Sequence, residues 1–195
     1  MKILKLFLIC LFLTSCANKL PEDRFYNLDI QYKEKLFYGQ PLSGNIKIHE
    51  VTAKGILSGQ AIAFVDKDDN YSSYQYAYWN QSPDWALEKK IKEFLIKSAT
   101  VEDVIDGSNS ISDFELYAQI ENLEQKETET GQIYSNISIK FSVFDLNRRK
   151  MILLDRYQSK KELPSADIDV FVTTINNDIK EILNHLIEDL RGRLS

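Results

Sequence analysis

The chain has 195 residues, which suits one domain with a short extension, and 44% of them are hydrophobic, enough to bury a core without staples. Its formal net charge is -5; removing residues 1–15 takes away Lys2 and Lys5 and leaves 22 basic against 29 acidic residues, a charge of -7. Nucleic-acid affinity comes largely from Lys and Arg that displace counterions, so this balance argues against nucleic acid as a partner. It argues equally against a domain held on anionic lipid by charge alone.

The first fifteen residues have the pattern of an export signal. Lys2 and Lys5 precede an apolar run over 6–13, which is far shorter than the ~20 residues of a spanning helix but matches a secretory apolar region. Leu13-Thr14-Ser15-Cys16 then resembles the lipobox of bacterial lipoproteins. We therefore expect residues 1–15 to be a lipoprotein signal peptide, cleaved between Ser15 and Cys16.

Cys16 is the expected lipid attachment site. An ordinary signal with a cysteine nearby by chance is the alternative, and Thr14 and Ser15 directly before the thiol disfavour it. Two or three acyl chains at ~0.8 kcal/mol per buried CH₂ give stable anchoring in a lipid bilayer. The other cysteine, Cys10, lies in the discarded part, so the mature chain carries no free thiol, as suits an oxidising periplasm.

The residue after the lipidated cysteine indicates which membrane holds the anchor. Asp at this place tends to retain Gram-negative lipoproteins in the inner membrane, and this sequence has Ala17. The expected location is the periplasmic side of the outer membrane, with the periplasmic face of the inner membrane as the alternative. Residues 16–23 then form the lipidated cysteine and its tether, and residues 24–195 one folded domain.

Alternating and helical patterns predict the elements of that domain in chain order. Short strands are expected at 24–30 and 44–51, a hairpin at 61–65 and 71–79, and another short strand at 101–105. Three long strands with period-two alternation follow, at 114–121, 136–143 and 151–159, and the simplest arrangement for them is an antiparallel meander.

Two helices complete the pattern. Ser82-Pro83-Asp84 is a typical helix start, and apolar residues follow it at helical spacing to Ser98. After Pro164 a long helix with a broad apolar face runs to the end of the chain. The fold class predicted is α+β: a mostly antiparallel twisted sheet with the two main helices packed on one face.

The sequence offers little for catalysis. His49 and His185 are more often surface or packed residues than ligands or bases, and no P-loop, glycine-rich dinucleotide turn, HExxH or GxSxG occurs. Asp66, Asp68, Asp69 and Asn70 superficially match a calcium loop but lack its glycine and distal glutamate, so a solvated hairpin tip is preferred. We expect no enzyme activity, no metal site and no cofactor.

One stretch is a candidate partner surface. Tyr74, Tyr76 and Tyr78 alternate along the expected strand at 71–79, with Trp79 on the other side. Tyrosines are common in plain sheets as cross-strand pairs, and that reading is the more frequent. Tyr and Trp are also enriched at interface hot spots, so these four residues are the candidates for partner binding.

The order of features resembles the auxiliary lipoprotein component of ABC-type transport systems, the family of the PqiC (YmbA) lipoproteins. The matching segments are Phe25-Tyr26-Asn27-Leu28, then Tyr76 and Trp79 before Pro83, then Val101-Glu102-Asp103-Val104 and Asp113-Phe114-Glu115-Leu116. Two features depart from the family pattern: Asn80 follows the tryptophan where a small residue is usual, and a single proline begins the helix.

The resemblance implies a function that composition does not. Members of this family work beside a transporter ATPase, its permease and an MCE-domain protein in moving lipids between the two membranes. It implies a non-enzymatic component that docks the MCE assembly at the outer membrane and that could be a homo-oligomer. The alternative is a periplasmic module that itself carries a lipid or another hydrophobic ligand in a cleft between sheet and helices.

Overall fold

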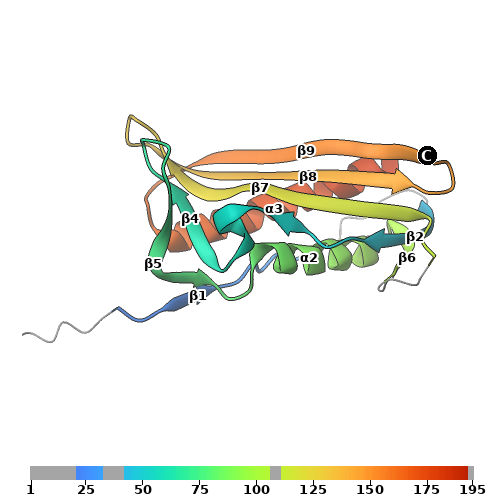
Figure 1. Cartoon of the computed structure of the whole chain (residues 1–195), viewed down its shortest axis with the longest axis horizontal. Helices are drawn as coiled ribbons and strands as arrows, with labels where there is room; N and C mark the ends of the chain where they lie inside the picture. Colours follow the sequence, from blue (N-terminus) through green and yellow to red (C-terminus); the bar gives the residue numbers. More distant parts are fainter. Residues whose placement is uncertain (1–20, 33–41, 106–110, 193–195) are drawn as a thin grey trace, which may run out of the picture.

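A computed structural model describes residues 21–32, 42–105 and 111–192 of the chain (Figure 1). Within them lie nine strands and two α-helices, as the α+β prediction requires. The elements are β1 (Arg24–Tyr26), β2 (Leu42–Ile48), β3 (Thr52–Ala53), the 3-10 turn η2 (Gly55–Ser58), β4 (Ala61–Val65), β5 (Tyr71–Trp79), α2 (Pro83–Lys97), β6 (Val101–Ile105), β7 (Phe114–Glu127), β8 (Ile133–Asp145), β9 (Lys150–Leu163) and α3 (Ile168–Gly192).

The long strands β7, β8 and β9 form the expected antiparallel meander. Their registers run from Phe114↔Asp145 to Glu127↔Ile133 and from Ile133↔Leu163 to Asp145↔Lys150. Each strand extends further than the alternation predicted, and β9 continues to Leu163. One face of the meander is apolar because every second side chain, such as Phe141 and Val143, points to it and is fully buried.

The other edge of β7 is shared by short strands that run parallel to it. β2 pairs with its first part, β3 with its middle and β4 with its last part. The sheet is therefore mixed: the expected antiparallel pairing holds for the long strands and for the β4–β5 hairpin, whereas β1, β2, β3 and β6 pair only in parallel.

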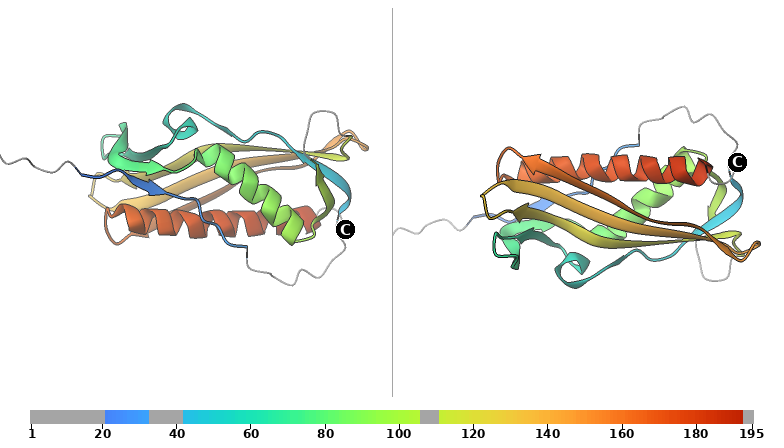
Figure 2. Two further views of the ribbon diagram at one scale, coloured as in Figure 1. Left: turned by 90° about the horizontal axis from the view of Figure 1, so that it is seen from below. Right: turned by 90° about the horizontal axis from the view of Figure 1, so that it is seen from above.

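Both helices lie on one face of this sheet, as predicted (Figure 2). The apolar stripe of α2, with Leu87, Ile91 and Phe94, and that of α3, with Phe171 and Ile182 among others, are buried against the inner face of the strands. Every buried hydrophobic side chain of the described core lies between Leu28 and Leu190. No described helix has the length and apolar character needed to cross a bilayer.

Two sequence predictions for the short strands need correction. The first strand ends at Tyr26 rather than Ile30, although Leu28 and Ile30 remain buried, because the chain after Tyr26 packs against the core without pairing to a strand. The second strand covers Leu42–Ile48 instead of 44–51. In both segments burial, which the apolar pattern reports, extends further than hydrogen-bonded pairing.

Candidate functional site

The expected lipid attachment residue Cys16 and the cleavage position at Ser15 lie outside the described residues, so both stay predictions of the sequence. The described chain begins at Pro21 and enters the fold through β1 (Figure 1). The point of entry shows which end of the domain is nearest to the predicted anchor.

Strand β1 is fixed at that end by contacts to β5 and to α3. Its residues pair in parallel with Ala77, Tyr78 and Trp79 of β5. The Arg24 guanidinium donates to both carboxylate oxygens of Asp169, each at 2.7 Å, and so joins β1 to the first turn of α3. Arg24 also holds the pKa of the Asp169 carboxyl below its usual value, and burial raises the pKa of the Tyr26 hydroxyl to about 12.

The segment after β1 is equally well held. The backbone N–H of Asn80 donates to the Tyr26 carbonyl at 2.7 Å, and the Asn80 and Asn27 side chains are hydrogen-bonded at 3.1 Å. From α3, the Asn176 amide donates to the Asn27 carbonyl at 3.3 Å. The place where the tether enters is thus a defined part of the fold.

The four candidate partner-binding residues do not form one surface. Tyr76 has a φ of +63°, and between the pairs Ala61↔Tyr78 and Ala63↔Ser73 the register of the hairpin shifts, so β5 carries a bulge of three extra residues. Trp79 is 1% exposed and belongs to the core, which corrects its place in the candidate surface. The bulge interrupts the period-two alternation, on which the prediction that the three tyrosines lie on one side of the strand depended.

Tyr78 and Tyr74 have different aromatic neighbours. The Tyr78 ring lies 5.9 Å from the ring of Phe25, which is 59% exposed, and both belong to the paired strands β1 and β5. Tyr74 instead packs on Phe64 with 5.2 Å between ring centroids and is partly buried against the core. Partner binding by Tyr74, Tyr76 and Tyr78 stays a prediction.

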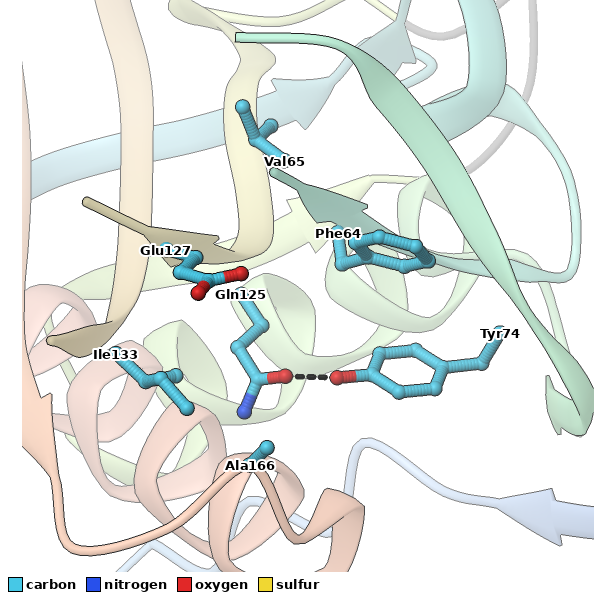
Figure 3. Close-up of a pocket in the computed structure, with 7 residues that line it drawn as sticks. All are labelled: Phe64, Val65, Tyr74, Gln125, Glu127, Ile133 and Ala166. Atoms are coloured by element: carbon cyan, nitrogen blue, oxygen red, sulfur yellow. Dashed lines mark hydrogen bonds between the residues drawn. The ribbon is translucent and has the colours of Figure 1, made fainter. Parts of the chain in front are cut away.

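A pocket of about 200 Å³ lies beside Tyr74 where the sheet extends past the start of α3 (Figure 3). Most of its wall is apolar, and the residues that line it are Phe64, Val65, Tyr74, Gln125, Glu127, Ile133 and Ala166. The Tyr74 hydroxyl donates to the Gln125 Oε1. The Gln125 Nε2, which the figure shows directed between Ile133 and Ala166, has no hydrogen-bond partner among the described residues.

A bulge in β7 puts Gln125 into this pocket. Ile120 pairs with Ile139 and Asn122 with Ser138, so Glu121 is an extra residue and the alternation of the strand changes side there. Before the bulge the even-numbered residues face the helices; after it Leu123 and Gln125 do, and Gln125 is 4% exposed. The residues after Glu121 are mostly polar, so the sequence there has no alternation that would indicate which side chains face the helices.

Two carboxylates are buried but differ in their surroundings. Glu124 is 1% exposed, accepts hydrogen bonds from the Asn122 and Asn136 side chains, and has a pKa raised by burial. Asp178 of α3 is fully buried, and its Oδ1 lies 2.5 Å from the Lys161 Nζ of β9. The ion pair raises the pKa of Lys161. The two carboxylates have separate hydrogen-bond partners.

The histidines and acids form no metal centre in the described part of the chain, where no group of three His, Cys, Asp or Glu side chains is close enough to hold an ion. The His49 ring stacks on Tyr117 at 4.1 Å, and its Nε2 lies 3.4 Å from Glu115. In the hairpin tip, the Asp66 side chain accepts from the backbone N–H groups of Asp68 and Asn70, each at 2.9 Å. This closes the turn around Asp66 by hydrogen bonds within the chain.

Comparisons with known proteins bear on the fold. No protein-family model matches the sequence, and no curated protein matches it. Among solved structures, the chain is similar to protein XCC0632 from Xanthomonas campestris, of family DUF330, with a TM-score of 0.76 and 13% identity over 87% of this chain and 96% of that one. It is also similar to the hypothetical protein CT253 from Chlamydia trachomatis, with a TM-score of 0.56 and 12% identity over 77% and 99%. At such identities the likeness concerns the fold.

Proposed function

We propose that this protein is a non-enzymatic lipoprotein component of an ABC-type transport system that moves lipids between membranes, and that it docks the MCE-domain protein of that system at the outer membrane. The observation that carries the proposal is the lipobox-like stretch ending at Cys16, shortly before a domain whose short segments resemble those of the auxiliary-component family in their order. A fold shared with XCC0632 over nearly its whole length supports this assignment.

The proposal makes the anchor and the partners separately testable. An affinity-tagged copy, cross-linked in cells, should recover the MCE-domain protein and, through it, the permease and ATPase. The Cys16→Ser variant should lose the acyl mass and leave the membrane fraction, because the acyl chains are the proposed attachment to the bilayer. Recovery of no transporter component by the lipidated protein would contradict the docking function, and a Cys16→Ser protein that stays on washed membranes would contradict the anchor.

A second candidate, a carrier that binds a lipid or another hydrophobic ligand, is favoured by the mostly apolar pocket beside Tyr74. Its volume of about 200 Å³ is below the ~300–1,000 Å³ of pockets that bury a drug-sized ligand, so it cannot enclose a whole lipid. Bound lipid in native mass spectra of a form that begins at Ala17 would favour the carrier; a clean mass of the free protein would favour docking.

A further inference from the structure

We propose that Phe25 and Tyr78 form a bilayer-contacting surface, which sets the side of the domain that faces the membrane. This inference rests on the proposed lipid anchor and goes beyond it, because an anchor alone leaves the orientation of the domain free. The surface named here, the β1–β5 aromatic pair, consists of these two side chains. Phe25 belongs to β1, the first strand of the described chain, which pairs with β5 (Figures 1 and 2).

The length of the tether limits the distance between this surface and the membrane. Five Cα–Cα steps separate Cys16 from Pro21, and at ~3.3–3.6 Å per residue a fully extended chain spans at most ~18 Å. The acyl chains hold Cys16 at the edge of the hydrocarbon, and the headgroup region on each side is only ~5–8 Å thick. The part of the domain around Pro21 is therefore kept within ~13 Å of the outer edge of the headgroups.

The aromatic pair has the chemistry of a membrane interface. Tyr and Trp are enriched at the headgroup level of bilayers, where an apolar ring with a polar edge is well solvated, and Tyr78 has such a ring. Phe25 is a large apolar side chain that is 59% exposed, next to the Tyr78 ring and only four residues after Pro21. An exposed phenylalanine in contact with water is unfavourable, and contact with the bilayer interface removes that cost.

The strand presents these rings rigidly. Arg24 on one side of Phe25 is fixed to Asp169, and the Tyr26 carbonyl on the other side accepts from the Asn80 N–H. The position of Phe25 relative to the body of the domain is thereby set.

The test uses the mature acylated protein in phosphatidylcholine vesicles, with acyl chains either plain or brominated near the glycerol, since bromine quenches tryptophan on contact. Two variants report on two surfaces: Phe25→Trp in the pair, and Leu154→Trp on β9, where the natural side chain is 58% exposed and so serves as a matched control. Both are compared with the unsubstituted protein, which contributes the emission of Trp79 and Trp85.

The expected result is that brominated lipid lowers the added emission of Phe25→Trp about twofold or more and leaves that of Leu154→Trp unchanged. If the protein floats with the vesicles and Phe25→Trp is quenched no more than Leu154→Trp, the bilayer-contacting surface is overturned while the anchor stands. If the protein does not float with the vesicles, the anchor is overturned, and the inference that rests on it falls too.

Discussion

The ion pair between Lys161 of β9 and Asp178 of α3 is the clearest place to test how this fold is held together. Asp178 is fully buried and lies 2.5 Å from the Lys161 Nζ, whereas the lysine side chain is 43% exposed. The Lys161→Met variant would keep most of the aliphatic stem and leave a buried carboxylate without its cation. Breaking a buried pair from one side costs about 3–5 kcal/mol.

The partial exposure of Lys161 sets the expected loss in the free energy of unfolding of the Lys161→Met variant. Because the lysine is partly solvated, water reaches the vacated side of the carboxylate, and we expect the lower end of the range, about 3 kcal/mol. For a domain of this size that corresponds to a melting temperature about 6–12 °C lower. The measurement is calorimetric unfolding at pH 7 of a form that begins at Ala17, which retains every described core side chain.

Two companion variants separate burial from charge. Lys97→Met removes one of the two lysines paired with Glu93, at 2.6 Å and with exposed fractions of 51% and 30%, and should cost only about 0–1 kcal/mol. Lys161→Met combined with Asp178→Leu removes both charges and should recover most of the lost stability, because an apolar pair can replace a buried ion pair. A Lys161→Met loss no larger than that of Lys97→Met would refute the argument from burial.

Two further predictions concern stability. Burial raises the pKa of Glu124 above its ordinary 4.5, so from pH 4.5 up to that raised pKa the folded chain binds a proton that the unfolded chain has lost, and the free energy of unfolding falls as pH rises. Glu124→Gln should therefore gain stability relative to the natural protein from pH 4.5 upward. A stability difference that does not change with pH in paired urea titrations would contradict this. Gly44 has a φ of +127°, and an added Cβ would lie 2.6 Å from the Asp113 Oδ2, so Gly44→Ala should lower the free energy of unfolding by about 3 kcal/mol, measured by thermal unfolding. Gly131 has a φ of +78° with open space around it, so Gly131→Ala should cost only about 1 kcal/mol. Equal losses would show that the close approach to Asp113 has no effect.

The sequence predicted those parts of the fold whose signal is local. Period-two alternation through Phe141 and Val143 identified the meander, and the Ser82-Pro83-Asp84 start with its apolar stripe identified α2, because these patterns report which face of an element is buried. The parallel pairings of β2, β3 and β4 along β7 were missed, since no residue of a short strand encodes which distant strand it will pair with.

The candidate sites show the same limit at the scale of single residues. The predicted tyrosine row assumed a regular strand, and the left-handed backbone of Tyr76 has no sequence signal such as Gly or Asn. Gln125 reached the pocket only because Glu121 is an extra residue in β7, and a strand that changes side within a polar segment looks like the beginning of a loop. Both errors arise from extra residues, three in β5 and one in β7, and an odd number of extra residues reverses the alternation of a strand.

The parallel pairing of β1 with β5 has a mechanical consequence. A pull on the N-terminal tether acts along β1, and in a parallel pair the evenly spaced hydrogen bonds then resist together in shear. The two bonds from Arg24 to Asp169 transmit part of the load to the long helix α3. Tension between a bilayer and a bound partner would thus be distributed over both layers of the domain, so that a strand of three residues can serve as its attachment point.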